Sequence, residues 1–213
     1  MKTAIVWFKT DLRLYDNEAL IKAIEQGEQI LPIYCFDDSH FEITQYGFKK
    51  TGSYRTQFLL ESLIDLDSNL RKMGSGLLIL KGKPEVEIPK IVEEYKVHKI
   101  FAEREVAWEE KRTEKLVQTE LFKLRCELES FSTSTLYHAV DLPFSIKDIP
   151  DVFTKFRKRI EQDATVRITF EKPFMIESPG IPEMKLPTLA ELGLEFSKID
   201  SRAAIQFKGG ETE

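Results

Sequence analysis

The first twenty residues, MKTAIVWFKTDLRLYDNEAL (residues 1–20), decide the fold of this chain. Residues 4–8 are an unbroken run of strand-forming apolar residues, short enough to be a strand that is buried on both faces. Residues 9–15 form a charged loop, and Asp16 is placed to cap the helix that follows. Leu20 and Ile24 then recur at helical spacing. The opening therefore predicts a strand, a loop and a helix, which is the first half of a βαβ unit.

The same alternation continues to about residue 131. Further strands are predicted at residues 30–36, 77–80, 99–102 and 127–131. Helices are predicted at residues 17–26, 53–73, 86–95 and 109–124. The long second helix carries one apolar stripe, made by Leu59, Leu63, Leu66, Leu70 and Met73. Strands separated by helices predict an α/β fold, with a Rossmann-like, five-stranded parallel sheet and helices on both faces.

The composition changes after about residue 132. One short helix is predicted at residues 151–163, with an apolar face made by Val152, Phe153, Phe156 and Ile160. Four prolines between residues 173 and 187 then interrupt any regular element. We therefore expect residues 1–131 to form the α/β domain and residues 132–213 to form a largely irregular linker.

The composition is that of an ordinary soluble globular protein, with 42% hydrophobic and 31% charged residues. A net charge of -5 argues against a general role in binding polyanions. Cys35 and Cys126 are expected to be buried free thiols in a reducing compartment. No apolar stretch approaches the roughly 18 residues of a membrane span, and no signal peptide precedes the first strand. A cytoplasmic protein without membrane contact is expected.

The first loop resembles the amino-terminal signature of the photolyase/cryptochrome family, roughly Trp-Phe-Arg-x-Asp-Leu-Arg-x-x-Asp-Asn-x-Ala-Leu. Lys9 stands where that family usually has arginine. PIYCFD (residues 32–37) and KTGSYRTQFL (residues 50–59) resemble its second strand and the entry to its long helix. Segments that resemble the DASH branch in particular are STLYH (134–138), DLPF (141–144), PDVFTKFRK (150–158) and FKGGET (207–212). The resemblance covers the whole chain and implies the α/β antenna domain followed by the interdomain linker.

In that family the chain continues into a larger helical domain that holds FAD and the site for a flipped pyrimidine dimer. The resemblance implies the antenna-type domain of a blue-light flavoprotein that repairs cyclobutane pyrimidine dimers. The absent helical domain is its expected partner, and DNA would be reached only through that domain. This chain alone is expected to bind no FAD and to repair no dimers. Apolar side chains of residues 164–213 are expected to lose part of their burial partner without it.

Carboxylates follow the fourth predicted strand, where ligands collect in open α/β sheets. A carboxylate there can accept paired hydrogen bonds from a ring edge of the aminopyrimidine type, and Trp108 could add apolar contact. The resemblance implies that a glutamate of this loop holds a light-harvesting folate, 5,10-methenyltetrahydrofolate. Glu105 is the first candidate and Glu109 the second, with weak affinity in this chain alone. The alternative is that these acids only favour the start of the next helix.

No other chemistry has comparable support in the sequence. No Gly-x-Gly-x-x-Gly or Walker loop is present, and the three histidines lie at no metal-ligand spacing. We assign no catalytic residue and no metal site. Two alternatives remain open: a stand-alone binding or scaffold module without photochemistry, and a nucleotide-binding α/β domain of another superfamily.

Overall fold

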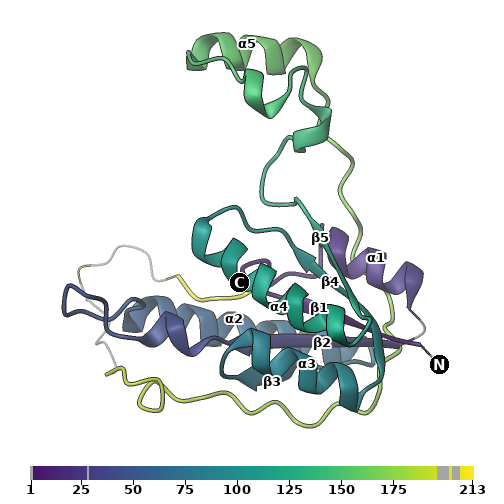
Figure 1. The fold of residues 1–213 in the computed structure, drawn as a ribbon, viewed down its shortest axis with the longest axis vertical. Coiled ribbons are helices and arrows are strands. Elements are labelled where there is room, and N and C mark those ends of the chain that lie inside the picture. Colours follow the sequence, from purple (N-terminus) through teal and green to yellow (C-terminus); the bar gives the residue numbers. More distant parts are fainter. Residues whose placement is uncertain (1, 28, 196–201, 203–206) are drawn as a thin grey trace.

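A five-stranded parallel sheet forms the centre of the molecule (Figure 1). The structure, a computed structural model, describes residues 2–27, 29–195, 202 and 207–213. The strands are β1 (Thr3–Phe8), β2 (Gln29–Phe36), β3 (Leu78–Lys81), β4 (Val97–Glu103) and β5 (Glu127–Phe131). They lie in the order β3-β2-β1-β4-β5, and every neighbouring pair is parallel. The predicted strand count and direction are therefore confirmed.

Helices cover both faces of this sheet, as predicted. Helices α1 (Glu18–Gln26) and α2 (Ser53–Lys72) pack on one face, and α3 (Pro84–Glu94) and α4 (Trp108–Lys123) pack on the other. The stripe of α2 is the centre of the first core, because Leu63, Leu66 and Leu70 are all buried against β1 and β2. The helix ends where Gly74 takes up a φ of +87°.

The cap of α1 is a correction to the sequence-based expectation. Asn17, rather than Asp16, caps the helix, with its side-chain oxygen accepting a hydrogen bond from the Leu20 N–H at 3.0 Å. Asp16 instead has a φ of +50°, and its carboxylate accepts a hydrogen bond from the N–H of Phe170. Asp16 is thus bonded to a distant segment, and the adjacent Asn17 is the cap.

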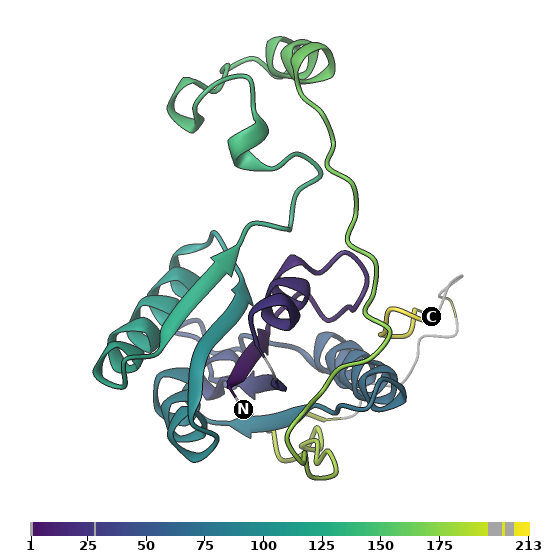
Figure 2. The ribbon, with the colours of Figure 1, turned by 90° about the vertical axis from the view of Figure 1, so that its right-hand side faces the viewer.

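Residues 132–163 form an arm that stands away from the sheet (Figures 1 and 2). The arm contains the short 3-10 turns η2 (Ala139–Asp141) and η3 (Ile146–Asp148) and the helix α5 (Phe153–Asp163). The apolar face expected on this helix is only partly buried: Ile160 is buried, but Phe153 is 72% exposed. Phe156 lies between them and packs on Phe144 with ring centroids 5.7 Å apart. The arm offers too small a core to cover the whole stripe.

Residues 164–195 run back along the sheet without regular structure, past α1 and α2 (Figure 2). Ile176 and Leu192 are nevertheless buried in the core between β2 and α2, and the Ile176 N–H donates to the Met73 carbonyl at 2.9 Å. The expectation that apolar side chains of residues 164–213 would lose part of their burial partner does not hold for these two residues, whereas Phe174, which is 98% exposed, agrees with it. Local periodicity does not report such packing, because the partners are far away in the sequence.

Cys35 and Cys126 are both buried, as expected, and neither forms a disulfide; the expected reducing compartment stays a prediction. Burial raises the pKa of the Cys35 thiol, and it raises the pKa of Cys126 to about 11. Within the described part of the chain, no helix is long and apolar enough to span a membrane.

Candidate functional site

A cavity of about 500 Å³ lies outside the carboxyl ends of β1 and β4. The strand order reverses between these two neighbours. From β1 the chain continues to β2 on one side, and from β4 it continues to β5 on the other side. Open α/β sheets bind ligands at this switch point. The cavity walls come from the loop after β1, the end of β2, the start of α2 and the start of α4.

The loop after β1 is fixed by its own buried polar groups. The carboxylate of Asp11 accepts hydrogen bonds from the Lys9 N–H at 3.0 Å and from the Asn17 side-chain amide at 3.2 Å. Burial raises the pKa of Asp11, and the hydrogen bond from the Lys9 N–H partly opposes that shift. Arg13 donates to the carbonyl oxygen of Asp16 at 3.0 Å. The signature residues Asp11, Arg13 and Asn17 therefore hold the shape of one cavity wall.

Lys9 ties this loop to the neighbouring strand. Its ammonium group donates to the carbonyl oxygen of Glu103 at 2.8 Å and to the carboxylate of Glu114 at 3.1 Å. It also lies 3.6 Å from the carboxylate of Glu105 and 4.7 Å from the ring centre of Trp7. The side chain of Lys9 is only 8% exposed, so it supplies a buried positive charge beside the carboxylates of Glu105 and Glu114.

Glu105 lines the cavity and keeps free hydrogen-bonding capacity. Besides the contact with Lys9, it has only a long 3.5 Å hydrogen bond from the Thr10 hydroxyl among the described residues. Desolvation raises the pKa of the Glu105 carboxyl, although Lys9 acts in the opposite direction. A half-desolvated carboxylate with open acceptor positions suits a ligand that brings N–H donors.

Glu109 also lines the cavity, but it is already paired. Its carboxylate accepts a hydrogen bond from Lys50 at 2.5 Å, and its side chain is 59% exposed. The lysine lowers the pKa of Glu109. Glu109 is therefore a rim residue, whereas Glu105 lies deeper.

Glu110 is one of the carboxylates after the fourth predicted strand, but the sequence-based reasoning did not choose it as a site residue. It lines the cavity, and its Oε2 atom is buried without a hydrogen-bond partner in the described part of the chain. A buried carboxylate oxygen without a partner is costly, which makes this atom a place for a ligand donor. A signal was present in the sequence, because Glu110 lies seven residues before the buried Val117 and so shares the inner face of α4.

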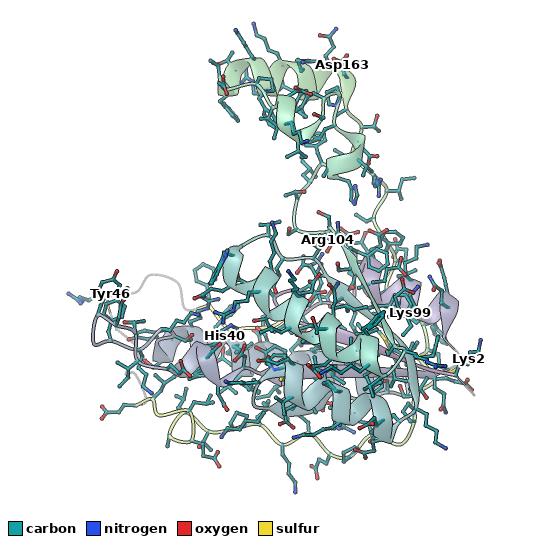
Figure 3. All side chains as sticks on the ribbon, viewed as in Figure 1. Lys2, His40, Tyr46, Lys99, Arg104 and Asp163 are labelled. Carbon is teal, nitrogen blue, oxygen red and sulfur yellow. The ribbon has the colours of Figure 1, made fainter. Side chains whose placement is uncertain are left out.

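Trp108 and Arg104 lie outside the cavity. Trp108 is 72% exposed, and the guanidinium of Arg112 sits 5.6 Å above its ring. The prediction that Trp108 could add apolar contact for a ligand in this cavity is therefore wrong. Arg104 donates to the carbonyl oxygen of Ser130 and lies at the base of the arm (Figure 3).

Aromatic and basic side chains complete the cavity. The apolar contribution comes from Tyr34, Phe41, Phe58 and Leu59. The basic contribution comes from Arg13, Lys50, Arg55 and His40, of which His40 belongs to the turn η1 (Asp38–Phe41; Figure 3). The cavity thus combines an acidic inner wall, apolar surfaces and basic groups, and no single sequence motif brings these residues together.

Comparisons with known proteins agree on one family. The family model for DNA photolyase matches residues 4–176. Cryptochrome DASH of Gloeobacter violaceus is 42% identical over 212 residues, which are 99% of this chain and 42% of that protein. The chloroplastic/mitochondrial cryptochrome DASH of Solanum lycopersicum is 41% identical and is covered to 39% of its length. The chain therefore spans about two fifths of the length of these relatives.

Solved structures show the same fold. The Synechocystis cryptochrome superposes with a TM-score of 0.93 at 40% identity, over 100% of this chain and 44% of that one. An archaeal photolyase from Sulfolobus tokodaii, solved with two FAD molecules, superposes with a TM-score of 0.74. At 24% identity over 99% of this chain and 44% of that one, the archaeal photolyase supports the fold alone.

Proposed function

Because this chain belongs to the DNA photolyase family, and its relatives of similar sequence are DASH cryptochromes, we propose that it is an antenna-type α/β domain that binds a folate chromophore. The ligand would lie in the cavity outside β1 and β4. The observation that carries the proposal is the pair formed by Glu105 and Glu110. One carboxylate has open acceptor positions and the other has a buried oxygen without a partner in the described residues.

The residues of the cavity fit 5,10-methenyltetrahydrofolate. A volume of about 500 Å³ lies within the roughly 300–1,000 Å³ typical of small-molecule sites. Glu105 and Glu110 would accept hydrogen bonds from the amino-pyrimidine edge of the pterin ring, and Phe58 and Tyr34 offer apolar surface. When bound, the folate would absorb near-ultraviolet light and pass its excitation on.

The rim of the cavity suits the other end of a folate. The glutamyl part of a folate carries carboxylates, and the cavity presents Lys50 and Arg55. Lys50 is paired with Glu109, so Glu109 would take part in binding by holding this lysine at the rim of the cavity. A competing carboxylate from the ligand would share Lys50 with Glu109.

The wider proposal follows from the family. Residues 1–131 would form the α/β domain and residues 132–213 the linker to a helical domain that holds FAD and meets DNA. The longer relatives support this arrangement, since the chain matches only 42% and 39% of the first two. We propose a cytoplasmic location, although the tomato relative is named as chloroplastic/mitochondrial. The chain alone would then be inactive in repair.

A direct experiment is equilibrium dialysis of the purified chain against increasing concentrations of 5,10-methenyltetrahydrofolate, in which the excess folate absorbance on the protein side of the membrane measures the bound ligand. Saturation at one equivalent is expected. If the protein side shows no folate absorbance above that of the bath at any concentration, the antenna proposal is wrong. The stand-alone module without photochemistry would then be favoured.

A further inference from the structure

The terminal segment, residues 207–213, docks on α2 through backbone hydrogen bonds. The Gly209 N–H donates to the carboxylate of Glu61 at 2.9 Å. The carboxylate of Asp65 accepts from the N–H groups of Glu211 at 2.9 Å and Thr212 at 3.3 Å. A side chain on Gly209 would overlap the carbonyl oxygen of Phe58, so the segment approaches α2 closely only because this residue is glycine.

Glu211 reaches from this segment to the loop after β1. One oxygen of its carboxylate accepts a hydrogen bond from the Leu14 N–H and the other accepts from the Tyr15 N–H, both at 2.8 Å. Charge-assisted hydrogen bonds of this bidentate kind are stronger than neutral ones and fix geometry. Residues that are almost 200 positions apart are thereby joined at a single carboxylate.

The loop that Glu211 holds is a wall of the cavity. Lys9, Thr10, Leu12 and Arg13 of this loop line it, and so do Gly210 and Glu211. Other contacts anchor other parts of this loop: Lys9 and Thr10 donate to Glu103, Asp11 is tied to Asn17, and residues 15 and 16 contact residues 169–170. None of these contacts uses the N–H groups at positions 14 and 15, because both of these donate to Glu211.

We propose that Glu211 is a positioning residue of the cavity. Its carboxylate holds the loop that carries Lys9 and Arg13, so that docking of residues 207–213 and ligand binding stabilise each other. Such coupling is reciprocal, because a ligand that favours the ordered loop must also favour the docked terminal segment. The ligand half of this inference rests on the proposed function, whereas the loop half does not.

Amide hydrogen exchange of the free chain tests the loop half. Wild type would be compared with Glu211→Ala, Glu211→Gln and the matched control Glu213→Ala, whose carboxylate only lies 3.7 Å from Lys208. We expect amides 14 and 15 to exchange at least about tenfold faster in Glu211→Ala, since both hydrogen bonds are lost. Glu211→Gln should fall in between, because an amide offers one acceptor oxygen, and Glu213→Ala should match wild type.

The same exchange data separate positioning from general stability. Amides of β1 should keep their wild-type rates in every variant. If amides 14 and 15 are unchanged in Glu211→Ala, or if β1 accelerates equally, Glu211 does not position the loop.

Folate titration of the same variants tests the ligand half. The dissociation constant is expected to rise at least about threefold for Glu211→Ala and to stay at the wild-type value for Glu213→Ala. If wild type binds folate and Glu211→Ala binds it equally well, the coupling is wrong while the proposed function stands. If wild type binds no folate, the proposed function fails and the coupling with it. The exchange rates still decide whether Glu211 holds the loop.

Discussion

The ammonium group of Lys9 lies 3.6 Å from the carboxylate of Glu105 and joins the loop after β1 to the loop after β4. The lysine side chain is 8% exposed and the glutamate side chain 20% exposed, so this contact is largely shielded from water. Lys9 is shared with Glu114 and with the carbonyl oxygen of Glu103. One lysine therefore compensates the negative charge of two carboxylates, Glu105 and Glu114. Its removal would leave both without a positive partner among the described residues.

Lys9→Met should lower the free energy of unfolding by about 3 kcal/mol, because removing one member of a buried ion pair leaves uncompensated charge. Urea denaturation gives this difference. The matched control is Lys22→Met, whose lysine forms an exposed pair with Glu25. That change should have a much smaller effect, because exposed ion pairs contribute little to stability. Equal losses in the two variants would show that the charge of Lys9 is not buried in solution.

Glu105 and Glu109 should affect the pH dependence of the free energy of unfolding in opposite directions. The folded-state pKa of Glu105 is raised, so folding takes up a proton at this site and its contribution to stability improves as the pH falls through the raised value. The pKa of Glu109 is lowered by Lys50, so its contribution is present above the ordinary carboxyl pKa and is lost on acidification.

Urea denaturation between about pH 3 and pH 7 checks this pair of signs, because the change for Glu105 lies above the ordinary carboxyl pKa of about 4.3 and the change for Glu109 lies below it. Relative to wild type, Glu105→Gln should lose stability on acidification, and Glu109→Gln should gain it. Shifts of the same sign in both variants would contradict the assigned environments.

Leu63→Asp should abolish cooperative folding, since an unpaired charge would enter the core between α2 and the sheet at a cost of several kcal/mol. Ile64→Asp is the control, because the neighbouring side chain is 54% exposed. Circular dichroism during heating should show a wild-type-like transition for Ile64→Asp and none for Leu63→Asp. A normal transition for Leu63→Asp would mean that the stripe does not face a core.

Ile176→Ala should reduce the free energy of unfolding by about 2–4 kcal/mol, which is typical of a large-to-small change in a core. The residue belongs to the irregular segment that runs back along the sheet, so the result reports whether this segment is part of the folded unit. Phe174→Ala, at a side chain that is 98% exposed, should have little effect. If both changes are equally mild in urea denaturation, residues near 176 do not pack on the sheet.

The fold was predictable because its signals are local. The stripe that contains Leu63 and Leu70 has helical spacing, and the last strand was predicted with the bounds Glu127–Phe131 that the structure has. The cap was not predictable, since Asp16 and Asn17 are both good cap residues and the contact of Asp16 with the distant Phe170 is seen only in the folded chain. The burial of Ile176 likewise depends on a partner that is about a hundred residues away.

The candidate site was predictable in part. Glu105 and Glu109 were placed at the carboxyl end of a strand, and both line the cavity there. Their role in binding a ligand stays a prediction. Glu110 was not chosen, because the sequence alone does not show which of two adjacent positions at the start of a helix faces the cavity. Glu211 was out of reach, because only the folded chain brings it to the loop after β1.

The measurement that tests the central claim most directly is a titration of 5,10-methenyltetrahydrofolate into wild type, Glu105→Ala and the control Glu127→Ala. Glu127 begins β5 and lies at the amino ends of the strands, away from the cavity at their carboxyl ends, with its side chain 73% exposed. Loss of a charge-assisted hydrogen bond is worth about 1.5–3 kcal/mol, so Glu105→Ala should weaken binding at least about tenfold. Glu127→Ala should bind like wild type. Equal affinities for all three proteins would remove Glu105 from the site and contradict the account of the cavity.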